Sequence, residues 1–287
     1  MVFLNKFHLF ADEVKEGYIL SDLKNIYNSY YPFKLFSYKQ FDKINFETVT
    51  IFYGNNGSGK TTLLNIIAKK LHASRKNNVN KGELFDIYIN NCDYEMSHEG
   101  DLKEIKLISS DDVFDYLLDI RAINSKVNRL KEDLADEYLN DTKYEFKDVI
   151  NDYELLKKKI DKSHMSMSKY IRTRLTNNNI IEQSNGESAL MYWQNEITDN
   201  SIYILDEPEN SLSAENQIKL KQFIEESARF YNCQFIISTH SPFLLGIEDS
   251  KIYDLDEMPV KTKKWQELEN VKAYYNFFKD RKEMFYD

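Results

Sequence analysis

The chain has 287 residues, of which 42% are hydrophobic, and this is enough to bury the core of one large or two small domains. Its formal net charge of −9 excludes a protein that coats nucleic acid or an anionic membrane with its whole surface. Its two cysteines lie far apart without a CxxC pair, which excludes a disulfide framework or a zinc knuckle and favours a reducing, cytoplasmic location. No apolar run approaches the roughly 20 residues that span a bilayer, and the first residues lack a secretion signal, so neither membrane insertion nor secretion is expected.

The first part of the chain predicts a strand, a glycine-rich loop and a helix in direct succession. Apolar and polar residues alternate over residues 3–10 and 33–52, which predicts strands, and the run 49–53 is β-branched and aromatic. The apolar residues of 63–71 recur at helical spacing. Between strand and helix lies the GxxxxGK[ST] pattern of a phosphate-binding loop, made of Gly54, Asn55, Asn56, Gly57, Ser58, Gly59, Lys60, Thr61 and Thr62.

This loop predicts a site for ATP with Mg²⁺. Glycines allow backbone N–H groups to approach phosphate oxygens closely, and the N-terminus of the following helix adds partial positive charge. We expect Lys60 to bridge the β- and γ-phosphates, Thr61 to ligate Mg²⁺ and Thr62 to lie near the α-phosphate. An ordinary glycine-rich turn is the alternative. Glycine is rare here, with eight in 287 residues, so a chance match is disfavoured.

A helical segment follows this part of the chain. Apolar residues recur at helical spacing over 113–160, with turn residues only around Asn140 and Asp141, which predicts two or three helices. Residues 157–174 are rich in lysine and arginine and contain a single acidic residue, Asp161. In an acidic chain such a cluster is a candidate for binding nucleic acid or another phosphate-rich partner, and an exposed, solvated helix face is the alternative.

Two later strands end in polar residues. The apolar run 201–205 is typical of a parallel strand buried on both faces, and it is followed by Asp206 and Glu207. Carboxylates at the end of such a strand point into the ligand crevice, so we expect Asp206 to hold Mg²⁺ and Glu207 to polarise the attacking water. An acidic loop after a core strand is the alternative, which the upstream phosphate-binding loop disfavours. The strand 233–239 ends at His240, for which a structural role is the ordinary explanation when it is considered alone.

A short polar motif precedes the strand 201–205. Residues 183–187 read Gln-Ser-Asn-Gly-Glu and come before an apolar helical pattern that includes Tyr192 and Trp193. Taken alone, this motif is typical of a helix N-terminus, with Ser184 as the capping residue and Glu187 as an acid in the first turn.

Four ordered motifs resemble those of the ATP-binding-cassette superfamily of P-loop ATPases. They are GNNGSGKTT at 54–62, QSNGE at 183–187, IYILDEPENSLS at 202–213 and IISTH at 236–240. The resemblance implies a composite site between two subunits, in which Ser184 and Gly186 contact the γ-phosphate held on the partner's loop while His240 contacts it in the same subunit. An ATP-driven head-to-tail homodimer that hydrolyses Mg-ATP is therefore expected.

The resemblance also implies roles for individual residues near the loop. Lys60, Glu207 and His240 are expected to be the catalytic residues. An antiparallel edge of strands is expected at the N-terminus, and an aromatic side chain is expected to stack on adenine. Tyr30, Tyr31 and Phe36 are the candidates for this stacking.

The chain departs from the transport ATPases of this superfamily in two places. No glutamine occurs from residue 42 through 182, where transporters carry one that senses Mg²⁺, and Ser109 and Asp111 are the candidates to replace it. Ser213 stands where an aspartate is usual. Together with Gly186-Glu187 in place of Gly-Gln, these departures resemble the soluble branch, which contains chromosome-structure and DNA-repair ATPases and the AAA-family ATPases of bacterial defence loci.

The sequence therefore predicts an α/β P-loop ATPase whose core, residues 1–112 and 180–287, holds a mixed, mostly parallel sheet flanked by helices. Residues 113–179 are expected to form a short helical insertion, and residues 265–278 an amphipathic helix that packs on the sheet or docks a partner. The predicted function is an ATP hydrolase that acts as a switch on nucleic acid or an effector protein in DNA maintenance or antiviral defence. The alternatives are the nucleotide-binding subunit of a transporter and a P-loop kinase for a small substrate.

Overall fold

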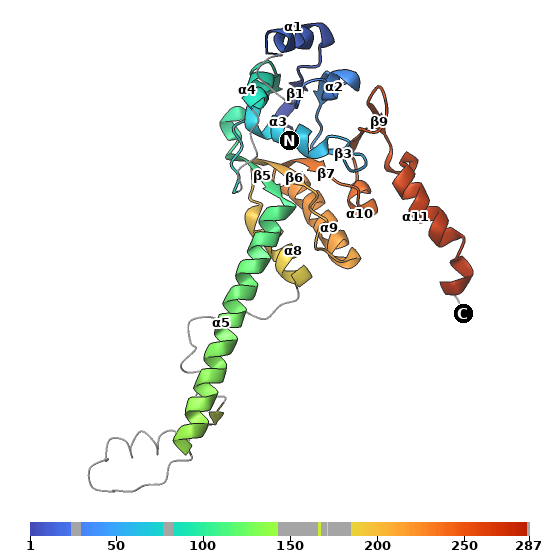
Figure 1. Cartoon of the computed structure of the whole chain (residues 1–287). Coiled ribbons are helices and arrows are strands. Elements are labelled where there is room, and N and C mark those ends of the chain that lie inside the picture. The colour runs from blue at the N-terminus through green and yellow to red at the C-terminus, as the bar shows by residue number, and fades with distance from the viewer. Residues whose placement is uncertain (24–29, 77–82, 143–165, 168–170, 172–184, 286–287) are drawn as a thin grey trace. The chain divides into compact units, whose positions relative to one another are not determined.

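The computed structural model describes residues 1–23, 30–76, 83–142, 166–167, 171 and 185–285 (Figure 1). These residues form two compact units, one made of residues 1–114 and 185–287 and the other of residues 115–184. The basic cluster predicted at 157–174 and the motif serine Ser184 fall outside the described residues, apart from residues 166–167 and 171.

The first unit is built around a six-stranded sheet. Its strand order is β5-β6-β7-β3-β8-β9, and every neighbouring pair is parallel except β8 and β9. The strands are β3 (Val49–Tyr53), β5 (Glu104–Ser109), β6 (Ser201–Asp206), β7 (Gln234–Ser238), β8 (Lys251–Asp254) and β9 (Lys261–Lys263). All side chains of β3 and β7 are buried, as expected for central strands with both faces covered.

Helices cover this sheet on both sides. Figure 1 shows α3 above the sheet and α8, α9 and α10 below it. The elements are α3 (Lys60–Lys70), α8 (Asn185–Glu196), α9 (Ala214–Phe230) and α10 (Pro242–Leu245). Trp193 of α8 is fully buried and packs edge-on against Tyr192. The predicted α/β core with a mostly parallel sheet is confirmed.

A second, antiparallel sheet lies at the N-terminal edge. Its order is β2-β1-β4, from β1 (Leu4–His8), β2 (Lys43–Asn45) and β4 (Asp93–Met96). The side chain of Gln234, at the start of β7, joins it to the main sheet by bonding the backbone N–H of Phe3 and the N–H and C=O of Leu4. The predicted antiparallel edge is therefore present.

Short helices surround these sheets. They are α1 (Glu13–Leu23), α2 (Leu35–Tyr38), α4 (Glu83–Asn90) and the single turns η1 (Glu99–Asp101), η2 (Trp265–Glu267) and η3 (Lys282–Phe285). The strand predicted to begin at residue 33 is wrong at its start, because α2 lies there. Phe33 and Phe36 are both buried, and a helical turn buries residues three apart on one face, whereas a strand would place them on opposite faces.

The long helix α5 (Ser110–Thr142) begins in the first unit and continues into the second. Ser109 and Asp112 form its N-terminal capping box: the Ser109 N–H donates to Asp112 Oδ2 at 2.8 Å, and the Asp112 N–H donates to Ser109 Oγ at 3.4 Å. Asn140 and Asp141, where turn residues were predicted, belong to α5, and the residues that follow Thr142 lie outside the described part of the chain. Among the described residues, none of the helices combines the length and apolarity needed to cross a bilayer.

The C-terminal helix α11 (Glu269–Lys279) differs from the expectation that it packs on the sheet. Val271 is the buried side chain of this helix, while the aromatic side chains of its outer part are half exposed or more. These are Tyr274, Tyr275, Phe277 and Phe278. Within the described residues, these aromatic side chains are therefore not part of the core.

Candidate nucleotide-binding and hydrolysis site

The parallel strands bring the candidate residues to one edge of the main sheet. In the strand register Ser109 pairs with Asp206, Asp206 with Ser238, and Ser238 with Phe52. The carboxyl ends of β5, β6, β7 and β3 therefore lie side by side, and the loops that follow them meet there. This is the edge at which open α/β sheets bind ligands.

The glycine-rich loop after β3 has a backbone that only glycine fits well. Gly57 and Gly59 have φ angles of +83° and +101°, in the left-handed region that other residues rarely adopt. A Cβ added to Gly54 would lie 2.6 Å from Ser58 Oγ. Helix α3 begins at Lys60 without a side-chain cap, so its first N–H groups face the loop. The loop and helix N-terminus together form an anion-binding concavity.

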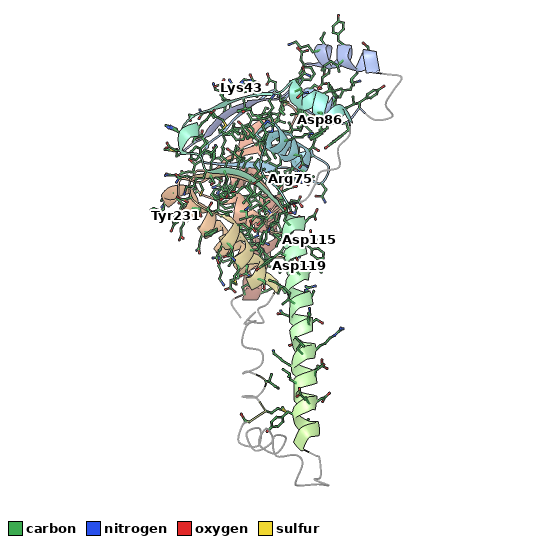
Figure 2. The ribbon with its side chains drawn as sticks, turned by 90° about the vertical axis from the view of Figure 1, so that its left-hand side faces the viewer. Lys43, Arg75, Asp86, Asp115, Asp119 and Tyr231 are labelled. Carbon is green, nitrogen blue, oxygen red and sulfur yellow. The ribbon has the colours of Figure 1, made fainter. Side chains whose placement is uncertain are left out.

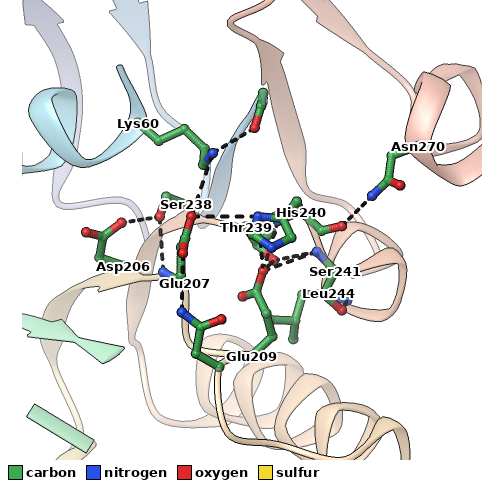
Figure 3. Close-up of polar contacts among 12 residues, drawn as sticks. Lys60, Asp206, Glu207, Glu209, Ser238, Thr239, His240, Ser241, Leu244 and Asn270 are labelled. Atoms are coloured by element: carbon green, nitrogen blue, oxygen red, sulfur yellow. Dashed lines mark hydrogen bonds and ion pairs between the residues drawn. The ribbon is translucent and has the colours of Figure 1, made fainter. Parts of the chain in front are cut away.

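Lys60 lies at the centre of this concavity. Its side chain is 4% exposed, and its ammonium group donates to the carbonyl oxygens of Gly54 at 2.7 Å and Asn55 at 3.3 Å. The same nitrogen lies 3.7 Å from Glu207 Oε1. Lys60 thus connects the loop after β3 with the acidic segment after β6 (Figure 3).

Asp206 is a partly buried carboxylate with two hydroxyl donors. Its Oδ1 accepts hydrogen bonds from Thr61 Oγ1 at 3.2 Å and from Ser238 Oγ at 2.5 Å. Burial raises the pKa of Asp206 above its ordinary value, although the bonds from Ser238 and Thr61 oppose this shift. A divalent cation would compensate this buried charge, and Thr61 and Asp206 already lie together as an oxygen pair of the type that Mg²⁺ prefers.

Glu207 lies between the side chains of a lysine and a histidine. Its Oε1 is 3.7 Å from Lys60 Nζ and 3.7 Å from His240 Nδ1, and its Oε2 accepts a bond from Asn210 at 3.2 Å. Its backbone has a φ of +49°, and its N–H donates to Ser238 at the end of β7. A strained backbone at a functional position is held by its surroundings. Here the backbone hydrogen bond to Ser238 directs the carboxylate toward Lys60 and His240 (Figure 3).

A pocket of about 680 Å³ opens beside the loop. Tyr30, Tyr31 and Lys34 line one side, and loop residues with Glu207 line the other. The Tyr31 hydroxyl donates to Thr62 Oγ1 at 2.9 Å, and its ring stacks on Phe85. Tyr30 and Tyr31 therefore lie where an adenine ring could stack. The third candidate, Phe36, is wrong: it is fully buried in the core and packs beneath Gly59.

The remaining predicted positions have different surroundings. Gly186 is the second residue of α8, and its predicted partner in function, Ser184, lies outside the described residues. Ser109 pairs with Asp206 in the sheet, and its hydroxyl donates to Asp112 at 2.8 Å, whereas Asp111 is exposed on α5. Ser213, which stands in place of an aspartate, caps α9 by accepting a bond from the Asn216 N–H.

Three further residues lie at or near the site, and the sequence did not single them out as site residues. Glu209 accepts three hydrogen bonds from the segment after β7. Asp256, after β8, accepts the N–H of Asn55 at 2.8 Å, so the loop is bound by a residue 201 positions away in the sequence. Arg75, labelled in Figure 2, is half buried; burial lowers its pKa, and the charges of Asp112 and Asp206 oppose that shift. The sequence signal for each is a lone charged residue after a strand or helix, which is too common to be decisive.

The described residues fit Mg-ATP. The loop offers N–H groups and Lys60 for phosphates, the Thr61 and Asp206 oxygens suit Mg²⁺, and Tyr30 and Tyr31 border a cavity of the right order for a nucleotide. Ser58 Oγ, buried in the loop, has no hydrogen-bond partner within the described part of the chain.

Comparisons with known proteins agree with this assignment. A family model described as "ABC transporter" matches residues 42–210, and one described as "AAA ATPase domain" matches residues 187–245. Because the first match covers more than half of the chain, the chain belongs to that family, the ATP-binding-cassette family of P-loop ATPases. Both models point to ATP hydrolysis in general. No curated protein matches the chain.

Solved structures are similar at low identity. The SMC head domain from Thermotoga maritima is 14% identical, with 91% of this chain and 98% of that chain covered and a TM-score of 0.42. The Smc head with an extended coiled coil bound to the C-terminal domain of ScpA, from Pyrococcus furiosus, is also 14% identical, with 98% and 100% covered and a TM-score of 0.40. A dimeric, post-hydrolysis ATP-binding cassette bound to ADP and Pi is 15% identical, with 79% and 90% covered and a TM-score of 0.35.

Proposed function

We propose that this protein is an ATP hydrolase whose ATP-bound form is a head-to-tail homodimer and whose output is a change in a bound effector protein or nucleic acid. The observation that carries the proposal is Glu207 Oε1, which lies 3.7 Å from both Lys60 Nζ and His240 Nδ1 at the mouth of the phosphate-binding loop. This proximity supports roles for Glu207 as the general base, for Lys60 in binding the phosphates and for His240 as a hydrogen-bond donor to the γ-phosphate.

In the proposed reaction, each residue of the site has a separate role. Lys60 and the loop N–H groups hold the terminal phosphates, and the Glu207 carboxylate orients the attacking water and takes its proton as the new P–O bond forms. His240 donates a hydrogen bond to the transferring phosphoryl group, whose bond to the ADP oxygen breaks. Mg²⁺, when held by Thr61 and Asp206, supplies positive charge to the phosphate oxygens. The products are ADP and phosphate, with no acceptor other than water.

The dimer completes the site in this proposal. Ser184 and Gly186 of one protomer would contact the γ-phosphate bound to the other, and residues 113–179 would form an insertion between the two parts of the ATPase core. The basic cluster at 157–174 is the proposed contact with nucleic acid or an effector in DNA maintenance or antiviral defence. The proposed location is the cytoplasm.

Light scattering tests the dimer directly. Glu207→Gln blocks hydrolysis and should trap the ATP-bound state, so Mg-ATP is expected to double the mass of this variant. Adding Ser184→Arg should abolish the doubling, because a bulky side chain would occupy the space of the γ-phosphate contact. If Glu207→Gln protein binds ATP and its mass does not change, the assignment of 183–187 is wrong and a kinase-like or partner-completed site is favoured.

The match to the model described as "ABC transporter" favours one second candidate, the nucleotide-binding subunit of a transporter. Stimulation of hydrolysis by DNA or RNA, lost when Lys157, Lys158 and Lys159 are changed to glutamate, would support the switch. Stimulation only by a purified membrane protein would support the transporter subunit.

A further inference from the structure

Glu209 is a buried carboxylate in the segment between β6 and α9. Its side chain is 6% exposed, and burial raises its pKa above the ordinary value. It lies two residues after Glu207, yet its side chain points away from the phosphate-binding loop and toward the segment that follows β7 (Figure 3). A buried carboxylate is costly unless its hydrogen bonds are used, so its contacts indicate its role.

Three hydrogen bonds converge on one oxygen of this carboxylate. Glu209 Oε1 accepts the Thr239 hydroxyl at 2.7 Å, the His240 N–H at 2.9 Å and the Ser241 N–H at 3.2 Å. Its other oxygen, Oε2, is buried and has no hydrogen-bond partner within the described part of the chain. One acceptor atom therefore fixes three consecutive residues, and His240 is the central one.

The backbone of His240 is held on both sides. Its N–H donates to Glu209, and its carbonyl accepts a bond from Asn270 Nδ2 of α11 at 2.7 Å. The imidazole itself is 43% exposed and is placed 3.7 Å from Glu207 by this backbone anchoring. Without the acceptor at Glu209, the Thr239 hydroxyl and the His240 N–H would lose their partner. The Ser241 N–H would keep its bond to Thr239 Oγ1 at 3.0 Å. The histidine would lose one of its two anchors.

We propose that Glu209 is a positioning residue that holds His240 against Glu207 for phosphoryl transfer, an inference that rests on the proposed ATPase function. It does so as a hydrogen-bond acceptor through Oε1 and does not touch the nucleotide. The role links the segment after β6, which carries the general base, to the segment after β7, which carries the histidine. A small displacement of a catalytic group can lower a rate by about a hundredfold.

Two variants separate this role from a merely structural one. Glu209→Gln keeps a carbonyl oxygen that can accept the three bonds, whereas Glu209→Ala removes the acceptor. We expect Glu209→Ala to lower kcat about 10- to 100-fold while KM for ATP and the affinity for ATP change less than about threefold. Glu209→Gln should keep kcat within about threefold of wild type. Glu226→Ala, an exposed glutamate on α9, is the matched control.

Hydrogen exchange of the backbone amides of His240 and Ser241, which donate to Glu209, reports the anchoring without reference to activity when it is measured on the same proteins. Faster exchange is expected in Glu209→Ala and wild-type exchange in Glu209→Gln. The inference is overturned if Glu209→Ala keeps the kcat of wild type, if its kcat and ATP affinity fall together, or if Glu209→Gln is equally impaired. If wild type binds or hydrolyses no ATP while exchange follows the expected pattern, the proposed function fails and the anchoring by Glu209 stands.

Discussion

Gly54 offers the sharpest test of the loop geometry, because the side chain that it excludes can be named. An alanine Cβ at this position would lie 2.6 Å from Ser58 Oγ and 2.9 Å from Ser58 Cβ, closer than real Cβ contacts. Ser58 cannot withdraw easily, since it is 7% exposed and its N–H donates to the Asn55 carbonyl at 3.0 Å. Gly54→Ala therefore requires the loop to shift.

The cost of that shift should appear in the affinity for ATP. Residues 55–57 are exposed, so the free protein can relax the clash by moving the loop, and binding must restore the wild-type path of the backbone. Overpacking of a well-packed site costs about 1–3 kcal/mol. At about 1.4 kcal/mol per factor of ten, the Kd for ATP should rise roughly 5- to 150-fold. The melting temperature in the absence of nucleotide should change little.

A double-mutant cycle identifies the cause. Ser58→Gly removes both clashing atoms and should recover at least about fivefold of the lost affinity in the Gly54→Ala background, which is a coupling of about 1 kcal/mol. Ser58→Ala, which leaves the Cβ in place, should recover less. The recovery is partial, because the Gly54 φ of +158° also disfavours alanine. Titration calorimetry measures the Kd for ATP of wild type, the three single variants and the two double variants.

The matched control is Gly57→Ala. Gly57 has a φ of +83° and no atom within 4 Å of an added Cβ. Gly57→Ala therefore causes no clash, and its only cost is that of a left-handed backbone at alanine, about 1–2 kcal/mol. Ser58→Gly should not restore the ATP affinity that Gly57→Ala loses. Wild-type affinity in Gly54→Ala, or purely additive effects of Gly54→Ala and Ser58→Gly, would refute the steric reasoning.

Three further predictions concern groups around the site. Tyr31→Ala should raise the Kd for ATP about 5- to 100-fold and Tyr31→Phe less than about threefold, since stacking on a base contributes about 1–3 kcal/mol; equal effects of the two in calorimetry would contradict stacking. Asn270→Ala removes the bond to the His240 carbonyl and should lower kcat about fivefold, the equivalent of about 1 kcal/mol, without changing ATP affinity; an unchanged kcat in a steady-state assay would contradict the anchor. Burial raises the pKa of Glu16 above 4.5, so the folded state binds this proton more tightly and the free energy of unfolding falls as pH rises between the two pKa values. In urea unfolding, Glu16→Gln should therefore gain stability relative to wild type as the pH rises above the ordinary pKa of a glutamate, and a difference that does not change with pH would contradict the shift.

Local pattern predicted the elements that carry the chemistry. The strands 49–53 and 201–205 were predicted because fully buried parallel strands are continuous apolar runs. The loop was predicted because its glycines are required by backbone geometry. The helix at residues 35–38 was not predicted, because alternation over a few aromatic residues does not distinguish a strand from a turn that buries Phe33 and Phe36 together.

Tertiary contacts account for what the sequence did not predict. In the sequence, Glu209 is one of several acidic residues that follow a strand, and nothing distinguishes it from the others. Only the parallel pairing of β6 with β7 brings its carboxylate to the N–H groups of residues 240 and 241. Asp256 likewise reaches Asn55 because β8 lies beside β3. The exposed aromatic residues of α11 have the composition of core residues, and burial is decided by packing that composition does not record.

The measurement that most directly tests the central claim is ATP turnover by wild type, Glu207→Gln and the exposed control Glu226→Gln, with ATP affinity measured on the same samples. A general base contributes about 10²- to 10⁴-fold, so Glu207→Gln should bind ATP within a few-fold of wild type and lose at least about a hundredfold in kcat, while Glu226→Gln is unchanged. Products should be ADP and phosphate in equal amounts. Turnover by Glu207→Gln at the wild-type rate, or no binding of ATP by wild type, would contradict the account.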